Sequence, residues 1–363
     1  MKKWLLSLCM VLALVACKDE KKQEASVDTR PIIKVGASLP LTGNLAYMGI
    51  SAQRALQLAL DKWNAKDTKY KYELLVEDDS FDTKRTMMNT SKLVYQNKVK
   101  AFFTILATSA NVASTITKKE KVIHMTSSYG SQPAEGFYNF NNMTQYDSPT
   151  DLMLKELKRR NVKSIGLLVS NNIGSFEQSE LLEKKIKEDG TIKVIGKHVY
   201  NPGTIEFRMI IQKMIENGEP DIFYIDGLTP DATLVAKYLK EVTGKVNLTT
   251  INDFIETPKR DEFEGLWFVE SASGTDEFNN KFVAKFGEPV FLCGANLYDN
   301  LDLFIEACEK SAHCENDEVV KLLLKVGSRE GAIGKYTMDS EGIIQSEASI
   351  KVIKNGKPIE VKE

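Results

Sequence analysis

The polar residues best placed for chemistry lie where apolar segments end. Ala107, Thr108 and Ser109 follow the apolar segment VKAFFTILA and precede a segment with helical spacing. A helix N-terminus offers free backbone N–H groups and the positive end of the helix dipole, and a hydroxyl adds a further donor. Such a position is a good receptor for a carboxylate. The alternative is that Ser109 is only the N-cap of its helix.

A turn-rich loop, SLPLTGNLAYMG at residues 38–49, also follows an apolar segment. In α/β proteins ligands bind at such strand ends. The glycines lack the GxGxxG spacing of a dinucleotide site, and no Lys-Ser/Thr pair follows them as in a Walker loop. We therefore expect this loop to form one wall of a cleft. Gly43 and Gly49 would make the turn and the helix entry, and Tyr47 would face a ligand.

Signals for an enzyme, a metal or a nucleic acid are weak. No serine lies in a GxSxG elbow, and His124 lies within a strand pattern, where packing is the better interpretation. No CxxC motif is present, and the three histidines are scattered. The formal net charge of −2 is the opposite of the basic surface that nucleic acids require. We expect no catalysis, no metal and no cofactor.

The first 17 residues, MKKWLLSLCMVLALVAC, have the features of an export signal. Two lysines precede an apolar run that is shorter than the roughly 20 residues needed to span a bilayer. The ending LVAC resembles the bacterial lipoprotein signal, in which the cysteine, here Cys17, becomes the lipidated first residue. A short N-terminal anchor with an incidental cysteine is the alternative. Residues 18–31 are charged and are predicted to be a flexible tether.

Three cysteines remain in the body of the chain. An exported protein enters an oxidising compartment, so Cys308 and Cys314 can close a small disulfide loop across CEKSAHC. The sequence leaves this pairing open. Cys293 is then predicted to be a buried free thiol.

Strand-like and helix-like periods alternate from Ile32 onward. In the first series we expect strands in IIKVGASL, YKYELLVEDDS, VKAFFTILA and KVIHMTSS, with helices after Gly49, over residues 83–96 and from Ser109. The pattern restarts with a helix at 151–160 and strands in KSIGLLVS, TIKVIGKHVY, PDIFYIDG and NLTTIND. A third segment has a strand in EGLWFVES, two helices, and β-hairpins turning at 340–342 and 355–356. Two βα series imply an α/β fold of two lobes with mainly parallel sheets and a cleft between them.

The order of these segments resembles one family, the type I periplasmic binding proteins, in the branched-chain amino-acid branch of the solute-binding lipoproteins of ABC transporters. The segments that carry the resemblance are VGASLPLTGNLAYMG, VEDDSFD, ILATSANVAS, HMTSSYGSQP, PDIFYIDGLTPDA and GAIGKYTMDSEG. The resemblance covers roughly Ile32 to Glu363. It implies two Rossmann-like lobes joined by three crossovers: residues 32–148 plus 256–331, and residues 149–255 plus 332–363.

The resemblance also implies where an amino acid would bind. The family holds the ligand α-carboxylate at the position of Thr108 and Ser109 and in the loop after the fourth strand, which here is Ser127, Ser128 and Tyr129. The alternative is that these serines are turn residues.

The family places an acidic ammonium partner after a late strand of the second lobe. Asp253 lies near that point, and Asp226 is a second candidate. A strand-end aspartate that caps the next turn is the alternative.

The chain departs from the family at two aromatic positions. Ile173 stands before Gly174 where amino-acid binders often have a tyrosine, and no aromatic residue follows Gly227. Such rings pack on the ligand ammonium or side chain. Tyr47, Tyr129 and Phe176 are predicted to line the pocket instead, although packing in a helix core is the better interpretation of Phe176. The ligand is then a small carboxylate or amino-acid-like molecule rather than a standard branched-chain amino acid.

The predicted function is therefore that of an exported solute-binding lipoprotein, held by lipid to a bacterial membrane and facing the periplasm or the cell exterior. Its lobes would close on the ligand by a hinge motion, and the closed form would dock on an ABC permease. The alternative is a lipid-anchored sensor or receptor subunit with the same cleft and no transport role.

Overall fold

The computed structural model describes residues 28–129, 138–257, 259–271 and 274–361 of the 363. The predicted signal with its lipidation site Cys17, and all but the end of the tether, lie outside these residues. The chain divides into residues 1–30 and a compact body, Pro31–Glu363. In the described ranges no helix has both the length and the apolar character needed to cross a membrane.

The first parallel sheet has the strand order β2-β1-β3-β4-β5. Its strands are β1 (Ile32–Leu39), β2 (Lys71–Asp78), β3 (Ala101–Ile105), β4 (Ile123–Ser127) and β5 (Asn139–Asn141). Both central strands, β3 and β4, are buried along their whole length because helices cover the two faces of the sheet. The near-continuous apolar pattern of VKAFFTILA has this cause.

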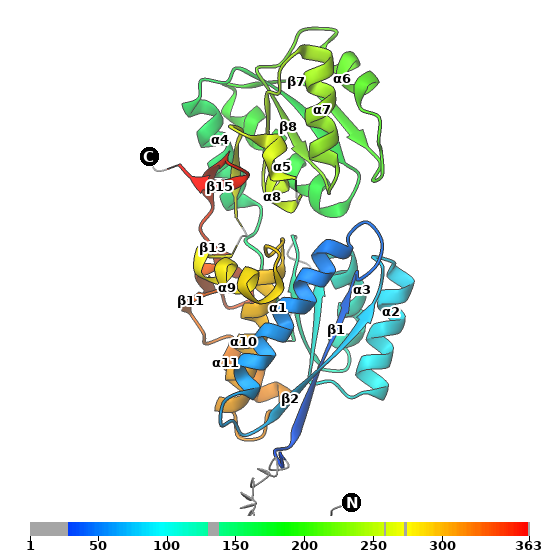
Figure 1. Ribbon diagram of the computed structural model, residues 1–363, viewed down its shortest axis with the longest axis vertical. Helices are drawn as coiled ribbons and strands as arrows, with labels where there is room; N and C mark the ends of the chain where they lie inside the picture. Colours follow the sequence, from blue (N-terminus) through cyan, green and yellow to red (C-terminus); the bar gives the residue numbers. More distant parts are fainter. Residues whose placement is uncertain (1–27, 130–137, 258, 272–273, 362–363) are drawn as a thin grey trace, which may run out of the picture. The chain divides into compact units, whose positions relative to one another are not determined.

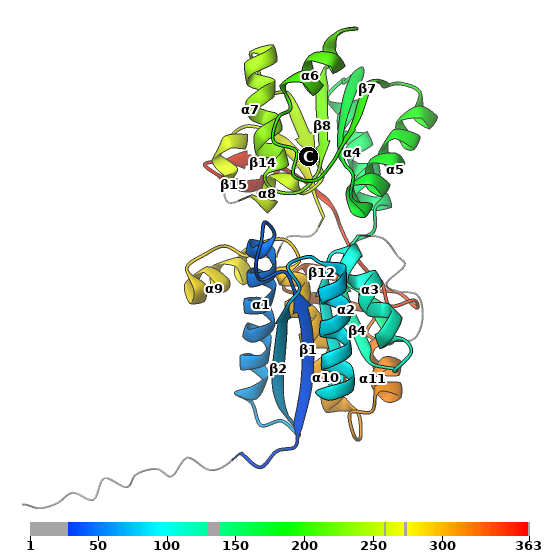
Figure 2. The same ribbon diagram turned by 90° about the vertical axis from the view of Figure 1, so that its right-hand side faces the viewer.

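Helices cover the first sheet on both faces (Figures 1 and 2). One face carries α1 (Ala46–Asn64), α10 (Gly294–Lys310) and α11 (Asn316–Leu323), whose apolar side chains join one large core. The other face carries α2 (Thr83–Ser91), its π-helical continuation η1 (Lys92–Gln96) and α3 (Ala107–Thr117), which pack in a smaller core. Strands β1, β2 and β3 lead into α1, α2 and α3, so these three helices start at the same edge of the sheet.

The second parallel sheet has the order β7-β6-β8-β9. Its strands are β6 (Ser164–Ser170), β7 (Lys193–Tyr200), β8 (Ile222–Asp226) and β9 (Leu248–Thr250). One face packs on α4 (Asp147–Arg159) and α5 (Ile173–Asp189), and the other on α6 (Arg208–Ile215) and α7 (Asp231–Thr243). Helix α4 starts at Asp147, four residues before the predicted start at residue 151. Pro149 lies in its first turn, where proline is tolerated.

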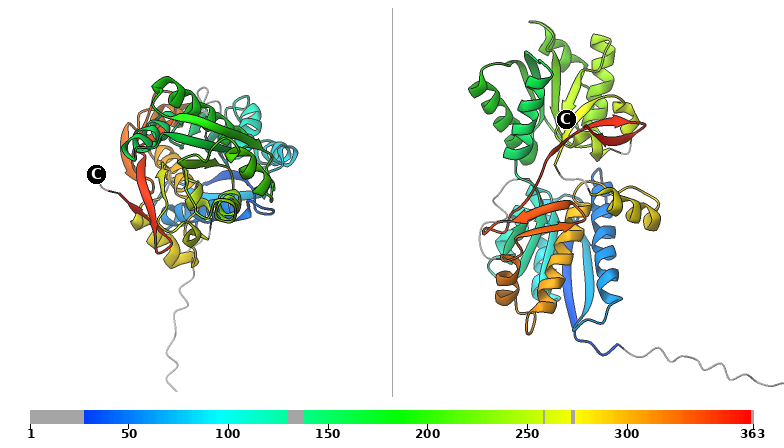
Figure 3. Two further views of the ribbon diagram at one scale, coloured as in Figure 1. Left: turned by 90° about the horizontal axis from the view of Figure 1, so that it is seen from above. Right: turned by 90° about the vertical axis from the view of Figure 1, so that its left-hand side faces the viewer.

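The C-terminal strands confirm the predicted turns. Strands β12 (Gly334–Met338) and β13 (Ile344–Ser346) pair across residues 339–343, and β14 (Ser349–Lys354) pairs with β15 (Lys357–Glu360) across Asn355 and Gly356. Strand β11 (Ser328–Gly331) completes a three-stranded sheet with β12 and β13. The chain then passes to the second lobe before β14 (Figure 3).

Strand pairing differs from the predicted lobe boundaries at two places. Strand β10 (Trp267–Glu270), expected in the first lobe, pairs with β14 and is bridged to the end of β9 through Ile251 and Val269. Tyr336 and Met338, expected in the second lobe, are buried in the core of the first. The βα pattern shows where elements begin but not which strand each one joins. On these pairings we propose a second lobe of residues 147–270 and 349–361.

The sequence left open whether Cys308 and Cys314 pair, and in the structure they do. Cys308 and Cys314 form a disulfide, with Cα atoms 4.5 Å apart, between the last turn of α10 and the loop before α11. Cys293, just before α10, is a free buried thiol.

Candidate functional site

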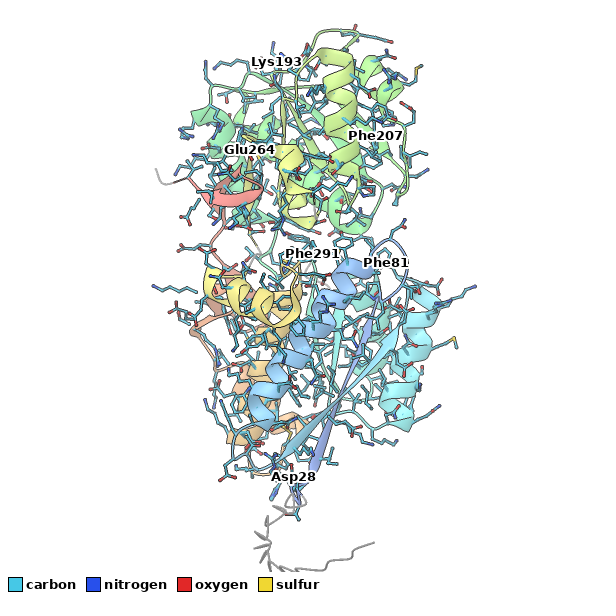
Figure 4. All side chains as sticks on the ribbon, viewed as in Figure 1. Asp28, Phe81, Lys193, Phe207, Glu264 and Phe291 are labelled. Carbon is cyan, nitrogen blue, oxygen red and sulfur yellow. A yellow bond between two sulfur atoms is a disulfide. The ribbon has the colours of Figure 1, made fainter. Side chains whose placement is uncertain are left out.

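A cavity lies where the carboxyl ends of the two parallel sheets face each other. It leaves about 60 Å³ for the centres of water molecules, which is room for roughly four or five waters. The first lobe contributes Phe81, Leu106, Ala107, Thr108, Ser127, Ser128, Tyr129, Met143, Leu292 and Cys293. The second contributes Asn172, Ile173, Gly174, Ser175, Gln178, Asp226, Gly227, Leu228, Ile251, Asp253 and Glu256. Figure 4 labels Phe81 at this end of the first lobe.

The first-lobe wall presents hydrogen-bond donors without a charged side chain. Helix α3 starts at Ala107, so the N–H groups of its first turn and its positive dipole end lie at the cavity. The hydroxyls of Ser127 and Ser128 are buried and have no hydrogen-bond partner within the described part of the chain. Buried hydroxyls normally find partners. This wall therefore has free capacity to bind an anionic group.

Several residues at or beside the cavity have a positive φ. Leu106, Cys293 and Asn252 have φ values of 65°, 70° and 72° and stand directly before α3, α10 and the short helix α8 (Asp253–Glu256). Phe81, which lines the cavity, has φ 60°. Positive φ is uncommon outside glycine and costs about 1–3 kcal/mol at such sites. The residues with positive φ thus stand where α3 and α10 of the first lobe and α8 of the second begin, beside the cavity.

The second-lobe wall is acidic. Asp226 ends β8 and accepts hydrogen bonds from the Tyr224 hydroxyl at 2.8 Å and the Ser179 hydroxyl at 3.4 Å. Asp253 accepts one from the Gly227 N–H at 2.9 Å. The Oε2 atom of Glu256 is buried and has no hydrogen-bond partner among the residues described.

Burial makes these carboxylates hard to ionise. It raises the pKa of Asp226 to about 7 and, with the negative charge of Asp226 beside it, that of Glu256 to about 8. The pKa of Asp253 is raised well above its ordinary value, first by burial and then by the charges of Asp226 and Glu256. None of the described lining residues is a lysine, arginine or histidine. Within the described ranges, no group of three or more His, Cys, Asp or Glu side chains could hold a metal ion.

Six of the nine sequence-predicted ligand residues line the cavity. They are Thr108, Ser127, Ser128, Tyr129, Asp226 and Asp253. The Tyr129 ring stacks on Tyr146 at 5.4 Å, and its hydroxyl hydrogen-bonds to Asn252 and lies 3.4 Å from the Ser271 hydroxyl. Tyr129 thus contacts both the start of the second lobe and the segment after β10.

The other three predicted residues lie outside the lining. Tyr47 is half-buried and packs edge-to-face on Phe291, with ring centroids 5.2 Å apart. The Ser109 hydroxyl is buried 3.4 Å from Oδ2 of Asp79, so it points back into the first lobe. Phe176 is 41% exposed on α5, so the helix-core alternative for it was also wrong.

Sequence reasoning missed Glu256 and the lining role of Cys293. Glu256 follows Asp253 by three residues, and that spacing places both on one helix face, which was a usable signal. For Cys293 no signal exists, because its place at the cavity depends on a strained turn before α10. His124 is packed as predicted, fully buried with Nε2 2.8 Å from the Thr104 hydroxyl, and burial lowers its pKa to about 4.

Known proteins share this architecture. A leucine-binding protein, LivK, of Thermotoga maritima is similar with a TM-score of 0.81 at 17% identity, covering 91% of this chain and 98% of that one. The branched-chain amino acid transporter substrate-binding protein LivJ of Streptococcus pneumoniae, solved with isoleucine, gives 0.79 at 19%, covering 91% and 100%. An ABC-transporter solute-binding protein of Rhodopseudomonas palustris, solved with 3,4-dihydroxybenzoic acid, gives 0.80 at 18%, covering 91% and 96%.

At these identities the likeness shows the fold, an α/β architecture of two lobes with parallel sheets. The family follows from a separate match. The family model described as "Periplasmic binding protein" matches residues 32–349, which is most of the chain and includes every residue that lines the cavity. This chain therefore belongs to the periplasmic binding proteins and has the type I fold, as the resemblance in its sequence predicted.

Proposed function

We propose that this protein is an exported lipoprotein, anchored through Cys17, that captures a small amino-acid-type ligand and delivers it to an ABC permease. The single observation that carries the proposal is the opposite character of the two cavity walls. Helix α3 and the hydroxyls of Ser127 and Ser128 suit a carboxylate, and Asp226, Asp253 and Glu256 suit an ammonium group.

The acidic wall favours an amino acid over an aromatic acid. One structural neighbour is solved with isoleucine and another with 3,4-dihydroxybenzoic acid, so the fold accepts both kinds of molecule. A benzoate carries no cation, and would enter a cavity that holds three buried carboxylates and no basic side chain among its described lining residues. An unpaired buried charge is strongly unfavourable. A zwitterion supplies the positive charge that this wall lacks.

Binding would proceed by closure of the two lobes. The ligand would meet the first-lobe donors, and the acidic wall would then move in and exclude water, which strengthens each polar contact. Tyr129 is well placed as a positioning residue, because it lines the cavity and contacts Tyr146, Asn252 and Ser271 near the crossings. A sensor subunit would use the same closure, and docking on a permease distinguishes the two.

A thermal-melting screen of the mature protein tests the proposal. We expect α-amino acids to raise the melting temperature by mass action, since they bind only the folded state, and benzoates to leave it unchanged. A shift with benzoates and none with millimolar amino acids would overturn the ligand class. For the import role, loss of uptake on deletion of the gene, restored by the wild-type chain, is the expected result; normal uptake in the deletion strain would favour the sensor.

A further inference from the structure

We propose that the ligand carries a second cationic group besides its α-ammonium, and so belongs to the small diamino carboxylic acids, a proposal that rests on the function above. The geometry that points to it is the distribution of three buried carboxylates along one wall of the cavity. A monoamino acid carries one positive charge, which cannot pair with all of them.

Glu256 is the carboxylate that a simple amino acid leaves without a partner. Asp226 already accepts two hydroxyl hydrogen bonds, and Asp253 accepts the Gly227 N–H. Glu256 is only 4% exposed, and its Oε2 atom has no hydrogen-bond partner in the described part of the chain. A buried polar atom without a hydrogen-bond partner is unfavourable, and more so when its group is ionised, so a donor on the ligand would complete this wall.

The acidic side chains face different parts of the cavity. Glu256 acts electrostatically on Tyr47 of α1 and on Cys293 beside α10, and its charge contributes to the raised pKa of both groups. Asp226 is instead held by Tyr224 of β8 and by Ser179 of α5. Glu256 thus also faces Tyr47 and Cys293, whereas Asp226 is held by side chains of the second lobe, although the two carboxylates are close enough for the charge of Asp226 to raise the pKa of Glu256.

Three neighbouring carboxylates could in principle favour a metal ion, but within the described ranges no such group has the arrangement to hold one. A ligand with two cationic groups can instead meet two different side chains of the wall. In our assignment, Asp226 and Asp253 bind the α-ammonium and Glu256 binds the second amine.

The test is calorimetric titration of the mature protein at pH 8 with matched pairs of ligands. Each pair has the same carbon chain with and without a terminal amine: 2-aminobutyrate and 2,4-diaminobutyrate, norvaline and ornithine, norleucine and lysine. We expect at least one diamino acid to bind about tenfold or more tighter than its neutral partner, since a hydrogen bond to a charged group contributes about 1.5–3 kcal/mol.

Three other outcomes are informative. If every neutral amino acid binds as tightly as its diamino partner, the proposal of a second cationic group is wrong, while the proposed function stands. If neither class binds at millimolar concentration, the proposed function itself fails. If putrescine, which has two amines and no carboxylate, binds more tightly than any diamino acid, the proposed binding of a ligand carboxylate at the start of α3 is wrong.

Glu256→Gln tests the assignment directly. The variant should lose the tenfold preference for the diamino acid and keep its affinity for the neutral partner, because only the second amine has lost its acceptor. Glu216→Gln, an exposed glutamate just after α6, removes the same charge from the second lobe away from the cavity and should keep the preference. A preference that survives in Glu256→Gln would overturn the role of this side chain.

A shorter carboxylate gives a second readout that does not depend on removing the charge. Glu256→Asp withdraws the carboxylate by one methylene, so the best diamino ligand should become one carbon longer than in the wild type. An unchanged chain-length preference would contradict the contact. Both variants are checked for a wild-type circular dichroism spectrum before titration.

Discussion

The two walls of the cavity differ in what they require when no ligand is present. The first-lobe wall presents helix N–H groups and hydroxyls, which stay neutral over the ordinary pH range. The second-lobe wall consists of buried carboxylates whose raised pKa values show that ionisation there is unfavourable. The first wall is thus ready to bind at any ordinary pH. The second depends on either a proton or a ligand cation.

The largest effect on binding is expected when two carboxylates are removed from the second-lobe wall. In Asp253→Asn combined with Glu256→Gln, affinity for the amino-acid-type ligand found by the melting screen should fall roughly 100-fold or more, since two hydrogen bonds to charged acceptors are lost. The ligand-free protein should melt at a higher temperature at pH 8, because two unfavourable buried charges are gone. Titration and melting measure the two effects. Retained affinity would show that the ammonium binds elsewhere.

A smaller effect is expected from the first wall. In Ser127→Ala combined with Ser128→Ala, affinity should fall about tenfold, with little change in ligand-free stability, because these hydroxyls have no partner to lose within the described structure. Ser109→Ala is the matched control. Its hydroxyl contacts Asp79 instead of the cavity, so affinity should stay within about twofold of wild type. Weakened binding in the Ser109→Ala control alone would show that Ser109 contributes to ligand binding.

The pH dependence of the empty protein should separate the walls further. The folded pKa values of Asp226 and Glu256, about 7 and about 8, lie above the unfolded values of 3.8 and 4.5. The folded state therefore holds protons that the unfolded state releases. The contribution of these groups to stability is complete below about pH 4 and is lost as pH rises through 7 to 8. A pKa difference of one corresponds to about 1.4 kcal/mol.

The expected measurement is a melting temperature that falls between pH 6 and 9 in the ligand-free protein and falls less in Glu256→Gln. Affinity for a cationic ligand should rise severalfold over the same range, since protons compete with it. Burial also raises the pKa of every other described ionisable group that interacts with this wall: Asp231, Tyr47, Tyr129, Tyr146, Tyr200, Tyr224 and Cys293. A melting temperature that is flat or rises with pH would show that the acidic wall is solvated.

The smallest expected effect on binding comes from the disulfide. Cys308→Ser with Cys314→Ser should lower the free energy of unfolding by about 2 kcal/mol, the value for so short a loop. Ligand affinity should be unchanged, because neither cysteine lines the cavity. Denaturant unfolding and titration of the same sample measure both. A loss of affinity would mean that the α10 terminus influences the site at its other end.

The sequence predicted the parts of the molecule that depend on local pattern. Apolar runs located the buried strands β3, β4 and β8, and the small polar residues after β3 located the start of α3. The resemblance to the family then brought Ser128, Asp226 and Asp253 together correctly around one cavity.

Other parts depend on contacts between distant segments. Tyr47 packs on Phe291, some 240 residues away, and this contact takes it out of the lining. Strand β10 belongs to the second lobe because it pairs with β14, which follows about 80 residues later in the chain. Leu106 and Cys293 adopt backbone angles that their residue types disfavour, so composition gives no sign of them.

The pairing of β10 with β14 bears on how the chain is made. Strand β10 meets the end of β9 on one edge, and among the described residues its other edge pairs with residues 349–352, close to the C-terminus. Until the ribosome has added these residues and export has brought them to the same side of the membrane, β10 presents an unpaired edge, which is open to association with other chains. This edge of the second lobe is therefore completed only when residues near the C-terminus are available, although the lobe's first strand ends before the middle of the chain.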